Sequence, residues 1–132
     1  MVEYKHVKGA TDTPDDAAAS RYIYIFYKLY IDHPDPVAAA RKSAETSSGL
    51  DSKYAQPFER PLNVSDIGRQ AHTYWQSIDQ RANVEFLVSN MTVRVYVGGE
   101  RSLSTDPVGL RQSFEESSVS IARGIASGLA AN

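Results

Sequence analysis

Three histidines are the side chains of this sequence best suited to acid–base or metal chemistry, and one of them, His33, stands between two aspartates. Asp32, His33 and Asp35 together supply the nitrogen and oxygen donors that metal ions bind in proteins. The same residue types also form turns and cap helices, and two prolines lie within the same stretch. We therefore interpret residues 32–36 as a turn followed by a helix N-cap, and we expect no metal ion.

His72 is the candidate for a catalytic base. A general base needs a concave pocket in which the imidazole is partly buried beside a carboxylate. The pattern around His72 instead favours an exposed helix face, since Arg69 and Gln76 lie one turn away on either side. Glu115 and Glu116 are neighbours in an expected helix and point about 100° apart, so they do not form a working pair of carboxylates.

The sequence has none of the motifs that hold phosphates, catalytic metals or nucleophilic serines: no Walker loop, no GxGxxG, no HExxH and no GxSxG. It also has no cysteine, which excludes disulfides, thiolate metal sites and a cysteine nucleophile. We predict that the protein is not an enzyme and uses no cofactor and no metal. A small-ligand enzyme that uses His72 stays as an alternative.

At 132 residues, with 42% hydrophobic and 23% charged residues, the composition is that of one soluble globular domain over residues 1–132. The net charge of −2 gives no general attraction to nucleic acid or to an anionic membrane. No N-terminal run has the order of a signal peptide, and no apolar run is long enough for a membrane span. We expect a protein of the cytoplasm, or of an assembled particle such as a virion, with no membrane partner.

The stretch from Ala17 to Ile31 (AAASRYIYIFYKLYI) is the element that the rest of the chain must accommodate. Its tyrosines are Tyr22, Tyr24, Tyr27 and Tyr30. Read as a strand, it places most aromatic rings on one face, and its residue types are enriched in sheets. Read as a helix, it begins with an N-cap and a first-turn proline at Thr13 and Pro14, followed by alanines that favour helix. We predict a helix over 14–31, with the strand as the alternative.

Three more helices are expected from cap residues and apolar periodicity, over 36–48, 65–82 and 107–130. The second of these carries the only tryptophan, Trp75, at the centre of its apolar stripe. From 84 to 97 the apolar period changes to two, which predicts a small antiparallel hairpin, with one long bent strand as the alternative. The hairpin must lie on the helices or pair with another strand, either residues 2–7 or a strand of a neighbouring subunit. Residues 1–13 form an N-terminal arm and 50–64 a long connecting loop. The expected fold class is mainly α, of the α+β type, with four helices and one hairpin.

The last expected helix carries a row of small residues at intervals of four: Ser120, Gly124 and Gly128. A glycine inside a helix costs about 1 kcal/mol relative to alanine. Close packing of a second helix against this row is the compensation that we expect, by analogy with small-residue contacts between membrane helices. A flexible terminal tail is the alternative.

These features favour a non-enzymatic structural subunit that works by self-association, of the kind found in viral, phage or secretion-type particles. Its expected association residues are the four tyrosines and the row of small residues, because an apolar helix exposed on all sides needs a partner to bury it. We expect a homo-oligomer, with other structural proteins as possible partners. The alternative is a nucleic-acid-binding adaptor in which residues 14–48 form a hairpin similar to a helix-turn-helix. Its phosphate contacts would be Arg41, Lys42, Arg94 and Arg101.

Overall fold

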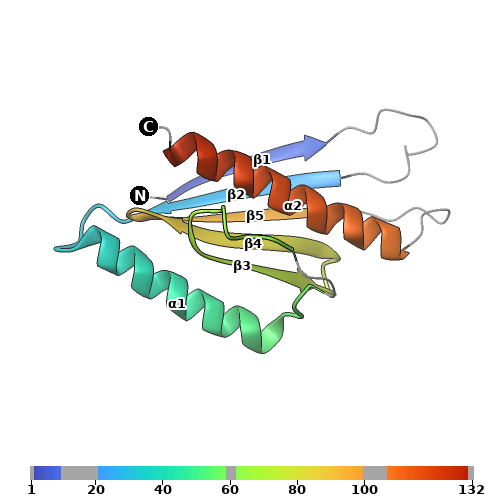
Figure 1. Cartoon of the computed structure of the whole chain (residues 1–132), viewed down its shortest axis with the longest axis horizontal. Helices are drawn as coiled ribbons and strands as arrows, with labels where there is room; N and C mark the ends of the chain where they lie inside the picture. Colours follow the sequence, from blue (N-terminus) through green and yellow to red (C-terminus); the bar gives the residue numbers. More distant parts are fainter. Residues whose placement is uncertain (1, 10–20, 59–61, 100–106, 131–132) are drawn as a thin grey trace.

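The fold is seen in a computed structural model, which describes residues 2–9, 21–58, 62–99 and 107–130 (Figure 1). In order along the chain, its elements are β1 (Val2–Gly9), β2 (Arg21–Leu29), α1 (Pro36–Tyr54), β3 (Arg69–Gln76), β4 (Arg81–Val88), β5 (Met91–Gly99) and α2 (Pro107–Ala130). The described part of the chain is therefore an α+β fold with two helices and a sheet. The expectation of a mainly helical fold with four helices is wrong.

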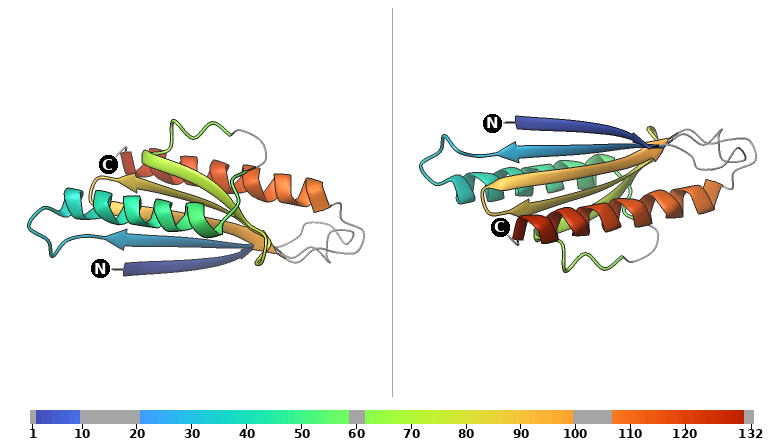
Figure 2. Two further views of the ribbon diagram at one scale, coloured as in Figure 1. Left: turned by 90° about the horizontal axis from the view of Figure 1, so that it is seen from below. Right: turned by 90° about the horizontal axis from the view of Figure 1, so that it is seen from above.

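The strands form one antiparallel sheet in the order β1-β2-β5-β4-β3. The two helices lie on opposite faces of it, since Figure 2 shows α1 in front of the strands from below and α2 in front of them from above. α1 contacts β3, β4 and β5, and α2 contacts β4 and β5. β1 lies at the edge of the sheet, beyond both helices in both views of Figure 2. Neither helix is long and apolar enough to cross a membrane.

β4 and β5 form the expected hairpin, but it lies inside a larger sheet. Its register pairs Val88 with Met91 across a tight turn, in which Ser89 has a φ of 52°. A positive φ at this position is what tight hairpin turns require. β5 pairs on its other side with β2, and β4 pairs with β3. The partners of the hairpin are therefore strands that the sequence analysis predicted as helices.

The face of the sheet under α2 forms the main core. Val84, Phe86 and Val95 point toward it and are at most 1% exposed. Phe114 of α2, also 1% exposed, packs against them, and the small side chain of Ala122 lets the helix lie close to the sheet. Burial of each large side chain stabilises the fold by about 1.5–3 kcal/mol. This contact explains why α2 has the bounds that its apolar stripe predicts.

The opposite face packs against α1 over a smaller apolar contact. Tyr30, Ala40 and Leu87 form its buried cluster, at 7%, 0% and 3% exposed. α1 begins where the sequence predicts, because Asp35 caps it: the Asp35 Oδ1 accepts a hydrogen bond from the Ala38 amide at 3.1 Å. The helix continues to Tyr54, so it is longer than the predicted 36–48 and includes the first part of the expected 50–64 loop.

The helix predicted over 14–31 is wrong where the structure describes it, because Arg21–Leu29 is strand β2. Residues 10–20, which carry the N-cap signals, lie outside the described residues. β2 lies between β1 and β5 and carries apolar side chains on both of its faces. Such a strand lacks the alternation that separates a strand from a buried helix. Its β-branched and aromatic residue types were the better indicator.

The helix predicted over 65–82 is also wrong, because Arg69–Gln76 is strand β3 and residues 77–80 turn into β4. Tyr74 and Trp75 are consecutive, yet they are 5% and 4% exposed. Successive residues of a strand point to opposite faces, and here a helix covers each face, so both are buried. Ser65 caps no helix, since its hydroxyl donates a hydrogen bond to the Asn63 Oδ1 at 2.7 Å.

Candidate functional site

The start of β3 carries a backbone irregularity. Gly68 and Gln70 both have a φ of 52°, and the register with β4 shifts between Arg69 and His72. This is a β-bulge, which redirects the neighbouring side chains. A Cβ on Gly68 would lie 2.7 Å from the carbonyl oxygen of Leu87, so only glycine fits there. Arg69 pairs in register with Leu87 and therefore shares its face of the sheet, the one that α1 covers.

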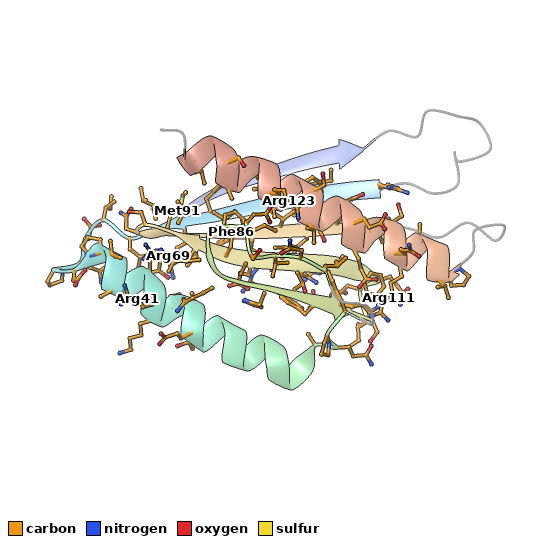
Figure 3. The ribbon with its side chains drawn as sticks, in the orientation of Figure 1. Arg41, Arg69, Phe86, Met91, Arg111 and Arg123 are labelled. Atoms are coloured by element: carbon orange, nitrogen blue, oxygen red, sulfur yellow. The ribbon has the colours of Figure 1, made fainter. Side chains whose placement is uncertain are left out.

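Arg69 and Arg41 line one cavity of about 380 Å³ between α1 and the sheet. Figure 3 shows Arg41 on α1 and Arg69 next to that helix. The lining is Val37, Arg41, Arg69, Gln70, Leu87 and Ser89. Neither arginine side chain forms a hydrogen bond or an ion pair with another residue in the described part of the chain. We call this cavity, which two arginines line, the arginine cavity.

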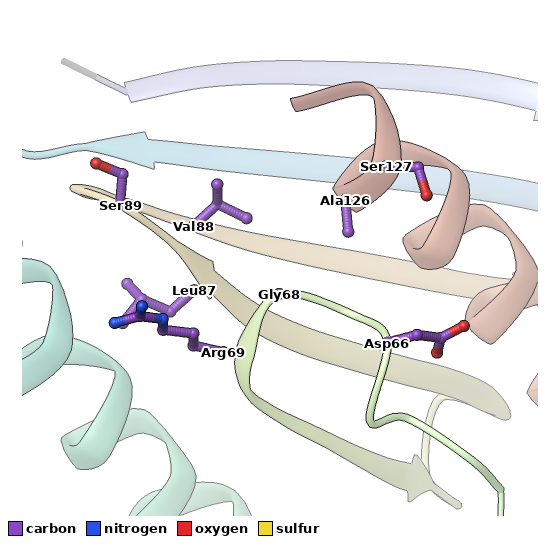
Figure 4. A pocket seen from close by; sticks show the side chains of 8 residues that line it. All are labelled: Asp66, Gly68, Arg69, Leu87, Val88, Ser89, Ala126 and Ser127. Carbon is purple, nitrogen blue, oxygen red and sulfur yellow. The ribbon is translucent and has the colours of Figure 1, made fainter. Parts of the chain in front are cut away.

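A second cavity, of about 340 Å³, adjoins the arginine cavity on the side of α2. Figure 4 shows its lining residues, with the side chain of Arg69 directed toward α1 and away from Ala126 and Ser127. Asp66, the acid of this lining, is paired with Arg123, whose Nε lies 2.6 Å from the Asp66 Oδ2. The acidic group is therefore compensated, and the charge of Arg69 is directed into the arginine cavity.

His72 lies on the same face of β3, deeper in the seam. It lines a cavity of about 350 Å³ together with Ala44, Glu45, Gln70 and Ala71. Its side chain is 22% exposed, and its Nε2 lies 3.6 Å from the Glu85 Oε2. The structure thus places His72 beside a carboxylate in a concave site, not on the exposed helix face that the sequence pattern indicated.

Glu85 is held by its partner across the β4–β5 ladder, Arg94. The Arg94 Nε donates a hydrogen bond to the Glu85 Oε2 at 2.9 Å, and the Arg94 Nη2 lies 2.7 Å from the same oxygen. Arg94 also donates from Nη1 to the Tyr96 hydroxyl at 2.8 Å. Burial acts to lower the pKa of Arg94, but Tyr74, Glu85 and Tyr96 together raise it. A carboxylate oxygen shared in this way is a weak proton acceptor, which makes Glu85 a poor catalytic partner for His72.

Aromatic rings extend toward β2 on the face of the sheet that carries Glu85 and Arg94. Tyr22 and Tyr24 meet edge to face, with ring centroids 5.1 Å apart. The guanidinium of Arg81 lies 4.2 Å from the centroid of the Tyr96 ring. Burial raises the pKa of Tyr22, although Arg81 beside it acts in the opposite direction. The face therefore combines rings and cations that belong to one network within the chain.

The tyrosines predicted to mediate self-association lie on β2 and just after it. Tyr22, Tyr24 and Tyr27 are half-buried in a single copy of the chain. Tyr30 is 7% exposed, because it packs with α1 in the smaller apolar cluster. Ile31, the next residue, is 51% exposed. One copy therefore covers the aromatic stretch only in part.

The row of small residues lies on the exposed side of α2. Ser120, Gly124 and Gly128 are all exposed. A Cβ built on Gly124 or Gly128 would meet no atom within 4 Å beyond its own helix. The row therefore faces open space in one copy, and its packing against a second helix stays a prediction.

The residues predicted to contact nucleic acid do not form one group in the described structure. Arg41 and Lys42 are exposed on α1, Arg94 is held by Glu85, and Arg101 lies outside the described residues. The structure instead joins Arg41 with Arg69, which the sequence analysis placed on a helix face. The signal that was available is Gly68, since a glycine within an apparent element often marks a bulge.

Within the described residues, no group of three or more His, Asp or Glu side chains is arranged to hold a metal ion. Asp32, His33 and Asp35 are exposed in the turn before α1. Comparison of the chain with protein-family models, with curated proteins and with solved structures found no match.

Proposed function

We propose that this chain is a non-enzymatic structural subunit, of the kind found in viral, phage or secretion-type particles, that associates with further copies of itself through the β1–β2 edge of its sheet. The observation that carries the proposal is the incomplete cover of β2. From Arg21 to Tyr27 every residue of this strand is half-buried, although β2 has a pairing strand on each side.

The incomplete cover follows from where the helices lie. α1 and α2 make their contacts chiefly with β3, β4 and β5, so the outer part of the sheet extends past them. β2 brings Tyr24 and Phe26 to one face of this outer part, and Ile23 and Ile25 to the other. Contiguous apolar surface of this kind supports a protein interaction site.

A second copy of the chain is the partner that fits this edge. β1 pairs with β2 and has no strand on its outer side among the described residues. The backbone groups of an edge strand pair readily with another strand. Antiparallel pairing of two β1 strands about a twofold axis joins two sheets into one and places the outer parts of both sheets side by side, so that their half-buried faces form one continuous surface.

The enzyme alternative has one observation in its favour, the position of His72 beside Glu85. The two Arg94 contacts on the Glu85 oxygen weigh against it, because they stabilise the charged carboxylate and make the oxygen nearest to His72 a weaker proton acceptor. We therefore place self-association ahead of catalysis.

Light scattering of the purified chain over a range of concentrations tests the proposal. A mass above the 14.5 kDa of one copy is expected at micromolar concentration, falling on dilution. Phe26→Ser and Tyr24→Ser remove apolar surface from β2, and we expect each to weaken association at least about tenfold, which corresponds to about 1.4 kcal/mol. Ile78→Ser is the matched control, since Ile78 is 95% exposed in the turn between β3 and β4.

Two results would overturn the proposal. One is a constant mass of one copy up to high concentration, with an unfolding temperature that does not depend on dilution. The other is an equal loss of association in the Ile78→Ser control, which would show that the β1–β2 edge has no special part in it.

A further inference from the structure

We propose that the arginine cavity binds the phosphate group of a small phosphomonoester. The cavity measures about 380 Å³, which is within the range of small-molecule sites. It lies between α1 and β3, and β3 is at the opposite edge of the sheet from β1. The inference is therefore independent of self-association.

Both arginines lie next to contacts of one buried residue, Leu87, which is 3% exposed. Ala40 of α1 packs on Leu87 and directly precedes Arg41, while Arg69 is the register partner of Leu87 on β3. The bulge residue Gln70, which has a φ of 52°, lines the same cavity. Non-glycine residues in this conformation are strained, and such strain collects at binding sites.

The charge of the cavity is not compensated from within. Arg41 and Arg69 form no ion pair with the described residues. Asp66 is already paired with Arg123. Glu45, one helical turn after Arg41, lines the neighbouring cavity and forms no ion pair with Arg41. Two like charges that face one cavity repel each other, and a bound anion removes that repulsion.

Phosphate is the anion that fits best. A guanidinium presents planar pairs of N–H donors that match phosphate oxygens, and two of them balance the two negative charges of a monoester. The side chains of Gln70 and Ser89 add neutral hydrogen-bonding groups to the same lining. A nucleic-acid backbone fits less well, because Arg94, expected to join Arg41 in such a contact, is held by Glu85.

Binding of inorganic phosphate and of phenyl phosphate, followed by calorimetry at constant ionic strength, tests the inference. Arg41→Gln and Arg69→Gln should each weaken both ligands at least about tenfold, or about 1.4 kcal/mol. Arg69→Lys keeps the charge but loses the planar fork, and we expect it to bind more weakly than the natural chain. Lys42→Gln is the matched control, because it removes one exposed positive charge next to Arg41 on the same helix. We expect a change of less than about twofold there.

The inference is overturned if phosphate binds no better than chloride, or if the two glutamine variants bind it as the natural chain does. Binding of dimethyl phosphate and of a single-stranded oligonucleotide, measured in the same way, distinguishes a site for phosphomonoesters from a site for the phosphodiesters of nucleic acid. Equal or tighter binding of either diester would replace the monoester assignment by a nucleic-acid contact. Circular dichroism and the urea midpoint of each variant show that a loss of binding is not a loss of the fold.

Discussion

Arg94 and Glu85 face each other across β4 and β5, and two guanidinium nitrogens lie within 2.9 Å of the single carboxylate oxygen Oε2. The Glu85 side chain is 6% exposed and that of Arg94 is 28% exposed, so water compensates neither charge fully. A buried ion pair of this kind contributes little by itself, but the loss of one partner leaves the other charge without compensation.

Arg94→Met should therefore lower the free energy of unfolding by about 3–5 kcal/mol. The comparison is Arg123→Met, because Arg123 forms its ion pair with Asp66 at the surface, where the two side chains are 41% and 51% exposed. Exposed pairs contribute about 0–1 kcal/mol. Urea denaturation of both variants measures the difference. The double variant Glu85→Gln with Arg94→Met should recover part of the loss, and equal losses in the two single variants would contradict the assignment.

Alkaline pH should destabilise the fold through Tyr22. Burial raises the pKa of this phenol in the folded chain above 10.0, the ordinary value that applies to the unfolded chain. Its contribution is fully present below pH 10.0 and is lost as the pH rises through the folded pKa, because the unfolded chain releases the proton first. Tyr22→Phe should remove this part of the pH dependence. Urea midpoints between neutral and alkaline pH measure it, and Tyr24→Phe is the comparison.

The sequence predicts some elements of this fold well and others badly, for one physical reason. α2 and the start of α1 are marked by local signals, an aspartate followed by a proline, and the structure has helices there. β3 lies in the part of the sheet that has a helix on each face, and β2 carries apolar side chains on both faces, so neither strand alternates between apolar and polar residues. Tyr74 and Trp75 show the result, since two consecutive buried residues fit a strand covered on both sides as well as a helix.

The candidate site was less accessible to sequence reasoning. The sequence predicts that Arg41 is an exposed arginine on a helix. Its neighbour in the cavity, Arg69, comes from a strand that follows much later in the chain, so the sequence alone does not bring the two together. Glu85 and Arg94 are nine positions apart and meet only because the hairpin register places them opposite each other. A correct strand assignment for β3 would have placed His72 and Glu85 on one face. Gly68 within the supposed helix was the residue that argued against it.

Gly68→Ala should destabilise the fold and disturb the arginine cavity together. Gly68 has a φ of 52°, and a Cβ there would lie 2.7 Å from the backbone oxygen of Leu87, which cannot move aside as a side chain can. The strain of a left-handed non-glycine residue adds to this contact, for a total of at least about 1–3 kcal/mol. The urea midpoint measures the loss. Phosphate affinity should fall as well, because the bulge directs Arg69 into the cavity; unchanged affinity would separate the bulge from the site.

Gly98→Ala and Gly124→Ala form a matched pair with opposite expected signs. A Cβ on Gly98 would lie 2.6 Å from the Tyr22 hydroxyl oxygen, which is the end of a side chain, and 2.9 Å from the Arg81 Cβ, which is fixed to the backbone of β4. The Tyr22 ring must move, and β4 must shift. Overpacking of this kind costs about 1–3 kcal/mol. A Cβ on Gly124 meets nothing within 4 Å, and alanine is preferred to glycine within a helix by about 0.5–1 kcal/mol.

Urea denaturation at low protein concentration measures these two changes in one copy. The Gly124 variant has a second use, because that residue belongs to the row of small residues on α2. If a helix of another copy packs closely on this row, Gly124→Ala stabilises the single copy and at the same time weakens association in light scattering. If association is unchanged, α2 takes no part in the contact between copies, and the β1–β2 edge accounts for it alone.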